Sequence, residues 1–418
     1  MALFSESVAP TTRNRGDVSR TRIKRVALVA PDLEAEGGVQ SVVDFFRAIL
    51  TDSSRYHVDL ISLATAASDA SSRRALAPST WLRGPTLRDA QRRDSRVIHA
   101  GCNFAEIEFQ RYKPRAQLSA LLNTYDVVQV VAGTPAWALV AGDVKRPVAL
   151  QVATLASVER RAMLGQQRDG SVLWRRLMAK NTQRLDDLAL ARCHTVFVEN
   201  AWMHQYASRL RGGIRVVLHA PGVDTARFIP VSSPSEQYIL SVGRFADSRK
   251  NVRMLFDAYA MLVQSVPCAP RLVLAGATAP TAADMQFAAA RGIADRLEIR
   301  VNVPADELPS VYQNAMLFAL SSDEEGLGIA ILEAMACGLP VVSTRCGGPE
   351  MIVRDGATGF LVERNDASAF ADAMQRLVDN KELRGTFCSS ARRIAVEVFS
   401  HHASAERFLT TYDDIVGT

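Results

Sequence analysis

The sequence lacks several features that mark common classes of protein. No apolar run approaches the roughly 20 residues that a membrane-spanning helix needs. The N-terminus has no apolar signal-peptide core, so we expect a protein that is not secreted. The six cysteines form no Cys-x-x-Cys pair and are irregularly spaced, which favours reduced thiols in a cytoplasmic protein. Nucleic-acid motifs with interleaved aromatic residues are missing, and we expect no nucleic-acid partner.

Metal signatures are missing as well. The seven histidines show no metal-ligand spacing, and the adjacent His401 and His402 do not share one helix face. No Asp-x-Asp sequence occurs anywhere in the chain. We therefore expect neither a metal ion nor another cofactor.

Charge is only mildly unbalanced, with a net value of +5. Basic residues gather between Arg13 and Arg25 and between Arg73 and Arg96. Such clusters suit anionic lipid, nucleic acid or a phosphorylated acceptor. The simpler interpretation, which we favour, is a flexible tail followed by a solvated helix face. Weak contact of a basic N-terminal domain with a membrane surface, and hence a peripheral location, stays open as an alternative.

The length and pattern of the chain predict two α/β domains. With 418 residues and 48% hydrophobic content, the chain is long enough for two cores. After a polar tail at 1–20, residues 21–228 alternate helical segments with Val-rich strands, which predicts a parallel sheet covered on both faces. The expected strands are 25–30, 57–63, 126–131, 147–152, 195–198 and 215–218.

A polar Pro/Ser-rich linker at 229–236 separates this unit from a second one at 237–400. The strand pattern restarts there, at 238–242, 271–275, 297–301, 317–320 and 340–343. The last segment, 401–418, is expected to be a helix that packs back across the domains. Two such domains would face each other across a cleft, with ligands at the carboxyl ends of the strands.

The most informative stretch runs from 321 to 342. A strand ends near Leu320, a polar loop follows, and an apolar helix begins near Gly328. Free backbone N–H groups and the helix dipole at that point favour a diphosphate. Glu325 lies in the loop, near the place of a sugar attached to that phosphate. Glu333 is a carboxylate on an otherwise apolar helix, suited to bind the vicinal hydroxyls of a ribose.

The segment from Glu325 to Glu333, Glu-Gly-Leu-Gly-Ile-Ala-Ile-Leu-Glu, resembles the donor-site signature of the family 4 glycosyltransferases. The resemblance implies a GT-B fold of two Rossmann-like domains and a nucleotide-sugar donor. It places Glu325, Arg244 and Lys250 in catalytic roles, the two cations on the donor diphosphate. It also implies that donor-binding residues are Gly37, Gly38, Gly243, Val303, Gly326, Leu327, Gly328, Ile329 and Glu333.

One departure from the family concerns the strand at 147–152. Many members carry a His after it, beside the transferred sugar, whereas this chain reads Gln151-Val-Ala-Thr154-Leu. Gln151 or Thr154 takes over that contact, or the position is unfilled. Both are therefore candidates for the acceptor side of the site.

The resemblance implies a retaining, metal-independent glycosyltransferase that uses a UDP- or GDP-sugar in glycan or glycoconjugate biosynthesis. The acceptor is open among a lipid-linked glycan, a polysaccharide, a protein and a small molecule. Two alternatives remain. The first is a non-catalytic sugar-nucleotide-binding partner subunit, which the missing His favours. The second is a nucleotide-sugar epimerase of the same fold, for which no acid–base set is apparent.

Overall fold

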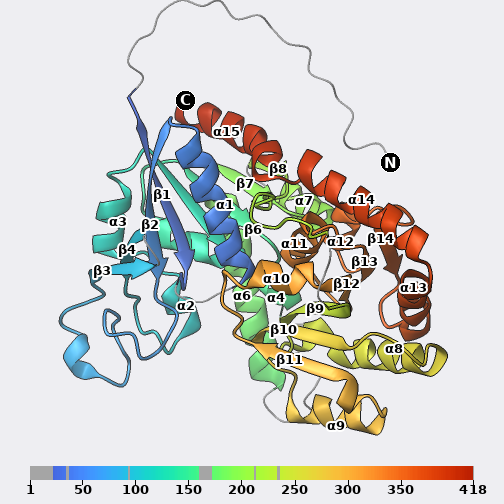
Figure 1. The fold of residues 1–418 in the computed structure, drawn as a ribbon. Helices are drawn as coiled ribbons and strands as arrows, with labels where there is room; N and C mark the ends of the chain where they lie inside the picture. The colour runs from blue at the N-terminus through green and yellow to red at the C-terminus, as the bar shows by residue number, and fades with distance from the viewer. Residues whose placement is uncertain are drawn as a thin grey trace, which may run out of the picture.

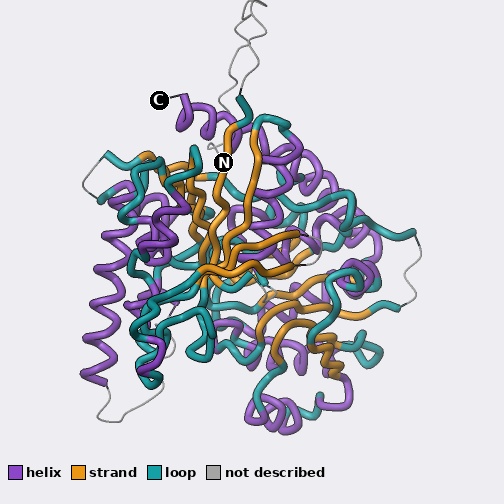
Figure 2. Tube along the Cα trace, turned by 90° about the vertical axis from the view of Figure 1, so that its left-hand side faces the viewer, coloured by secondary structure: helices purple, strands orange, loops and turns teal. Residues whose placement is uncertain are grey.

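The computed structural model describes residues 22–33, 37–92, 95–159, 172–210, 213–232 and 236–417, with the side chains of 172–179 left out. The expected tail at 1–20 lies outside these residues. The chain forms two parallel sheets with helices around both, the N-terminal one in blue and green and the C-terminal one in yellow to brown (Figure 1). Figure 2 shows the strands of the two sheets as separate groups.

The first sheet has the strand order β3-β4-β2-β1-β5-β6-β7-β8, and every pair except β3 and β4 is parallel. Every residue of β5, β6 and β7 is buried, because helices cover both faces of the sheet. The strands are β1 Lys24–Pro31, β2 Tyr56–Leu63, β3 Leu87–Arg92, β4 Ser95–Ala100, β5 Val127–Ala132, β6 Val148–Val152, β7 Thr195–Val198 and β8 Arg215–Leu218.

The helices and 3-10 turns of this domain connect these strands. They are α1 Gly38–Asp52, η1 Pro78–Thr80, α2 Glu108–Arg111, α3 Ala116–Leu122, η2 Pro135–Ala141, α4 Ala156–Glu159, α6 Val172–Arg192 and α7 Ala201–Ser208.

The second sheet is parallel throughout, in the order β11-β10-β9-β12-β13-β14. Its strands are β9 Tyr238–Arg244, β10 Leu272–Thr278, β11 Leu297–Val301, β12 Ala315–Leu320, β13 Val341–Thr344 and β14 Gly359–Val362. The helices that follow the linker are η3 Ser248–Lys250, α8 Val252–Ser265, α9 Ala282–Ala290, η4 Ala294–Arg296, α10 Leu308–Gln313, α11 Ile329–Ala336, α12 Pro349–Ile352, α13 Ala367–Asp379, α14 Lys381–Glu397 and α15 His401–Gly417.

The last helix, α15, packs on the N-terminal domain, as expected from the sequence. Phe408 of this helix packs its ring edge-on against Phe46 of α1, with centroids 4.9 Å apart. Tyr412 is fully buried in the same cluster and donates a hydrogen bond of 2.5 Å to Gln129 of β5. The chain therefore crosses back after the second sheet and completes the core of the first domain. None of the described helices is both long and apolar enough to cross a membrane.

The basic stretch from Arg73 to Arg96 is not a helix face, and this prediction was wrong. Its second half forms the β3–β4 hairpin, and its first half is a loop around η1. Arg96 pairs with Asp89 across the hairpin, and Arg92 pairs with Asp44 of α1. The polar outer strand was missed because an edge strand has no continuous apolar run to reveal it. The tail part of the first basic cluster lies outside the described residues.

Candidate active site

The loop between β12 and α11 forms the centre of the site at the carboxyl edge of the second sheet. Gly328 precedes α11 with a φ of 91°, a left-handed conformation that side chains rarely adopt. Backbone bonds hold the loop in place: the Glu325 amide donates to the carbonyl of Cys346, and the Gly348 amide donates to the carbonyl of Glu325, each at 3.0 Å. The N-terminus of α11 thus adjoins a fixed loop, as the sequence predicted.

Glu325 is already paired with Lys250. The Lys250 ammonium lies 2.5 Å from Oε1 of Glu325, and the Ser322 hydroxyl donates to the same oxygen at 2.6 Å. Lys250 comes from η3, which follows β9, so the pair joins the carboxyl ends of neighbouring strands. The aliphatic part of the Lys250 side chain lies 3.4 Å from the place that a Cβ at Gly243 would take. These contacts leave both charged groups mostly enclosed and fixed in orientation.

Arg244 is held much more loosely. It is the last residue of β9, its side chain is 57% exposed, and its closest carboxylate oxygen belongs to Asp247 at 3.5 Å. Asp247 is itself bound more tightly by Arg249, at 2.6 Å. Arg244 is therefore available to an incoming anion, whereas Lys250 would have to share its charge with Glu325.

Glu333 is enclosed among apolar side chains on α11. It is 8% exposed, and the Tyr312 hydroxyl donates to its Oε2 at 2.7 Å. Burial raises the pKa of Glu333 to about 7, an effect that the Tyr312 hydrogen bond only partly offsets. The sequence singled out Glu333 as a buried carboxylate in need of partners, and its partner here is this tyrosine.

The remaining donor-side candidates of the second domain surround this loop. Val303 follows the carboxyl end of β11 and packs against the domain core. Leu327 is buried in that same core. Ile329, the first residue of α11, packs against both this core and the core around α1. Ile329 thereby brings the start of α11 next to the N-terminal domain.

On the N-terminal side, Gly37 and Gly38 lie at the start of α1, after the carboxyl end of β1. Both are exposed, and a Cβ at Gly38 would meet no atom within 4 Å. This position at the carboxyl edge is the one the sequence predicted. Residues 34–36 just before them lie outside the described part of the chain.

The two domains touch directly at the site. A Cβ added to Gly326 would lie 2.5 Å from the Cβ of Ala153, which follows β6. The side-chain amide of Asn200 donates to the carbonyls of Gly326 and Ala153, at 2.8 and 3.1 Å. Only glycine fits at 326, because the second domain's loop packs against the backbone of the first.

A set of charged and polar side chains fastens this contact, and we call it the clasp: Thr154, Glu159, Arg249 and Glu324. The Thr154 hydroxyl donates to Glu324 at 2.5 Å, and Arg249 reaches Glu159 at 3.1 Å. Burial raises the pKa of Glu324. Sequence reasoning assigned no role to Arg249, Glu324 or Asn200. Three successive acidic residues at 323–325 in one loop were the available signal.

Gln151 and Thr154, the acceptor-side candidates, are both enclosed. Gln151 donates to Glu199 at 2.9 Å, and burial raises the pKa of that glutamate to about 7. Thr154 belongs to the clasp. Their role toward an acceptor stays a prediction, since neither side chain faces solvent in this closed arrangement.

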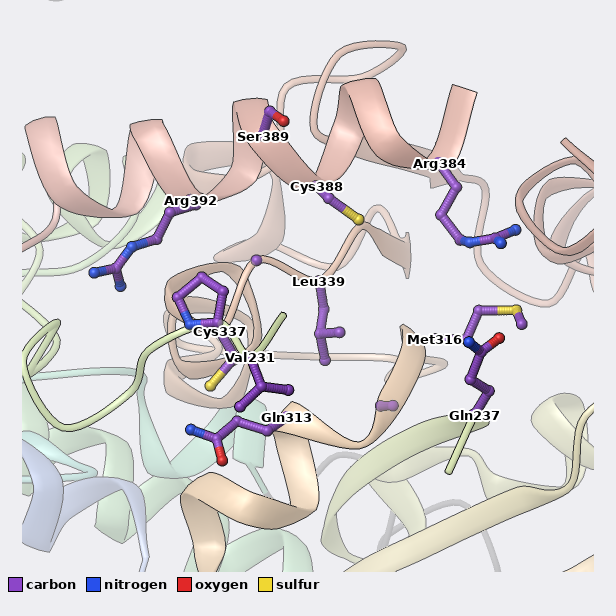
Figure 3. A pocket seen from close by; sticks show the side chains of 13 residues that line it. Val231, Gln237, Gln313, Met316, Cys337, Leu339, Arg384, Cys388, Ser389 and Arg392 are labelled. Atoms are coloured by element: carbon purple, nitrogen blue, oxygen red, sulfur yellow. The ribbon is translucent and has the colours of Figure 1, made fainter. Parts of the chain in front are cut away.

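A cavity of about 420 Å³ lies elsewhere in the second domain, between α14, the linker and the end of α11 (Figure 3). Its lining includes Gln237 before β9, Met316 early in β12 and Leu339 before β13. These residues mark the amino edge of the sheet, opposite to the site above. Among the described residues, no three His, Cys, Asp or Glu side chains gather as metal ligands.

Parts of the chain are similar in sequence to known glycosyltransferases. Residues 236–380 match the family model described as "Glycosyl transferases group 1". The D-inositol 3-phosphate glycosyltransferase of Salinispora arenicola is 32% identical over 226 residues, which cover 48% of this chain and 50% of that protein. The corresponding protein of Corynebacterium jeikeium is 33% identical over 221 residues, covering 48% and 52%. The chain thus spans about half the length of the curated relatives it matches.

Solved structures agree over almost the whole chain. Sucrose-phosphate synthase from Thermosynechococcus elongatus superposes with a TM-score of 0.73 at 20% identity, covering 94% of this chain and 99% of that one. HepE from Anabaena, in complex with UDP and glucose, has a TM-score of 0.65 at 16% identity and covers 94% and 100%. At such identities the likeness concerns the fold, which is that of two Rossmann-like domains, as predicted.

Proposed function

We propose that this chain, which has the GT-B fold and matches the group 1 glycosyl transferase model over 236–380, is a family 4 glycosyltransferase. In this proposal it moves a sugar from a nucleotide-sugar donor to an acceptor hydroxyl with retention of configuration. The observation that carries the proposal is the fixed group of Lys250, Ser322 and Glu325 beside the start of α11. It combines a cation for a leaving diphosphate with a carboxylate for the sugar.

The leaving group acquires negative charge as its bond to the anomeric carbon breaks. In this proposal, Lys250, Arg244 and the N–H groups of α11 stabilise that charge, and preorganised stabilisation of this kind is the largest single contribution to catalysis in many enzymes. The new bond from the acceptor oxygen forms on the same face of the sugar, and its proton passes to the departing phosphate oxygen. Glu325 then orients the sugar and the ammonium of Lys250 rather than forming a covalent bond. The protein's own cations take the place of a metal clamp in this scheme.

The identity of the donor is tested best with UDP-sugars first. Structures of HepE contain UDP and UDP-glucose. GDP-sugars form the second group, because the segment around Val303 would hold a base through backbone groups. D-inositol 3-phosphate, named in the relatives, is the first acceptor to test, ahead of lipid-linked glycans, polysaccharides, proteins and other small molecules.

The decisive experiment combines binding and turnover. A donor that binds the folded protein raises its melting temperature, by mass action, and slow release of the nucleotide without acceptor reports catalysis. We expect both with one UDP- or GDP-sugar, in the presence of EDTA, and loss of turnover in Glu325→Ala. Binding without any release would identify a non-catalytic binder, and a changed free sugar nucleotide would identify an epimerase.

A further inference from the structure

Two loops at the carboxyl edge of the first sheet carry an unusual number of exposed apolar side chains. Of the twelve large apolar side chains exposed in the described part of the chain, five lie in residues 76–109. Leu82 is 98% exposed, Leu76 88% and Trp81 47%. Ile107 lies just before the neighbouring short helix α2, and Phe109 lies within it. We call these five residues the apolar patch. Isolated exposed residues are ordinary, but a contiguous group marks an interaction surface.

The loop that bears most of the patch is held in shape by its backbone. The Arg73 amide donates to the carbonyl of Cys102 at 2.9 Å, and the Ala105 amide donates back to the carbonyl of Arg73 at 3.2 Å. The Trp81 indole donates to the carbonyl of Arg74 at 2.8 Å and packs edge-on against Phe104. The leucines are therefore displayed by a built loop, and Figure 1 shows this pale blue loop projecting from the rest of the domain.

The charge around the patch is positive. Arg73, Arg74 and Arg83 belong to the same loop, and Arg73 stacks over the Phe104 ring. Of the nearby carboxylates, Asp69 is already paired with His99. Glu106 accepts a hydrogen bond from the Ala75 amide, and backbone hydrogen bonds lower its pKa, with a smaller contribution from the charge of Arg74. Arg73, Arg74 and Arg83 thus lie beside carboxylates that are already engaged within the protein.

We propose that the apolar patch docks on the interface of a lipid bilayer that contains anionic lipids. Exposed leucines would enter the boundary of the acyl chains, Trp81 would sit at the level of the headgroups, and the arginines would contact lipid phosphates. A protein partner or a second copy would account for the leucines equally well. The combination with the exposed Trp81 and with Arg73 and Arg83, which form no ion pair within the described part of the chain, is what selects the membrane.

The apolar patch lies at the same edge of the first sheet as the candidate active site. The loops leave β2 and β4 at the carboxyl edge that also carries Gly37 and Gly38, on the N-terminal side of the site. If the proposed transferase function holds, a lipid-borne acceptor would reach the cleft without leaving the interface. Docking itself does not depend on transfer, so vesicle binding and donor binding can fail separately.

The test is sedimentation of the full chain with large vesicles of phosphatidylcholine alone or mixed with phosphatidylglycerol. We expect binding to the mixed vesicles, and a loss of about tenfold or more in Leu76→Ser/Leu82→Ser. The matched control is Met261→Ser/Val396→Ser, which removes two exposed apolar side chains from the second domain and should bind as the parent does. Trp81→Phe should remove the blue shift of fluorescence on binding.

Three outcomes would overturn the proposal: no binding of the parent protein, equal binding of the loop variant, or a lipid-free dimer that the loop variant disperses. Melting temperature and the donor-induced melting shift should be the same in the loop variant and the parent. That readout excludes misfolding and keeps the result independent of the proposed function.

Discussion

The carboxyl edges of the two sheets are built in opposite ways. In the second domain, most charged side chains of the site are enclosed and paired before any ligand arrives, Lys250 with Glu325 and Glu333 with Tyr312, while Arg244 alone of the candidates stays exposed. In the first domain, the same edge displays Leu76 and Leu82 to solvent, with Arg73, Arg74 and Arg83 in the same loop. The edge of the second sheet suits a small charged ligand of fixed shape, and the edge of the first sheet suits an extended surface.

This difference follows from the ligands that the two edges would serve. A diphosphate requires charges in fixed positions, because reorganising them during the reaction costs free energy. An interface requires apolar area and net charge, and tolerates variation in position. If the enclosed edge serves catalysis and not stability alone, substitutions there should lower turnover more than matched substitutions elsewhere.

Removing the ammonium of Lys250 should have the greatest consequence. In Lys250→Met, the leaving diphosphate loses a fixed cation and Glu325 loses its partner. We expect donor turnover to fall about 10²–10³-fold, measured as nucleotide release. Arg291→Met breaks a similar ion pair, 2.7 Å to Asp257, far from the site, and should leave turnover intact. Equal turnover in Lys250→Met and Arg291→Met would mean that the ion pair of Lys250 and Glu325 is only a structural contact.

Replacing Glu333 should separate function from stability. Its pKa rises from 4.5 to about 7 on folding, so between these values the folded state binds more protons than the unfolded state. The free energy of unfolding therefore falls as pH rises through this window and is lowest above it. The stability of Glu333→Gln relative to the parent should therefore increase by about 2–3 kcal/mol between pH 4.5 and pH 8. Urea unfolding at the two pH values measures this change. The donor affinity of the variant should fall.

Glu199 supplies the matched control for that experiment. It is also a buried glutamate with a pKa of about 7, but it lies in the first domain and is bonded to Gln151. Glu199→Gln should show the same gain in stability at pH 8 and an unchanged donor affinity. If both variants lost donor affinity equally, Glu333 would have no special place at the nucleotide.

Gly326 tests whether close approach of the domains is needed for turnover. Its added Cβ would lie 2.5 Å from the Cβ of Ala153, so Gly326→Ala should hold the domains apart at a cost of about 2 kcal/mol. We expect a lower kcat/KM and a larger radius of gyration by X-ray scattering. Adding Ala153→Gly should restore part of the loss. Gly385→Ala, which meets nothing within 4 Å, should change neither quantity.

The sequence was most informative where its pattern was continuous. Apolar runs located the buried strands, and the spacing from Glu325 to Glu333 located the site loop, since both depend on local order. Strand β3 of the β3–β4 hairpin was missed because it is an edge strand with no buried residue. The clasp was missed for a different reason: Thr154 and Glu324 are 170 positions apart, and only the packing of the two domains brings them together. The side-chain partner of Glu333, Tyr312, required the same tertiary information.

The smallest effect is expected within the clasp itself. Thr154→Val and Glu324→Ala each remove one side of the hydrogen bond between the domains. If this bond helps to close the cleft, their effects on kcat/KM should not add, with a coupling of about 1 kcal/mol in a double-mutant cycle. The matched cycle pairs Thr154→Val with Glu298→Ala, a carboxylate on β11 that bonds Arg300 instead, and should be additive. Additivity in both cycles would mean that the two domains close without this bond. The difference between the two carboxyl edges would then depend only on the enclosed charges of the second domain, and not on contacts between the domains.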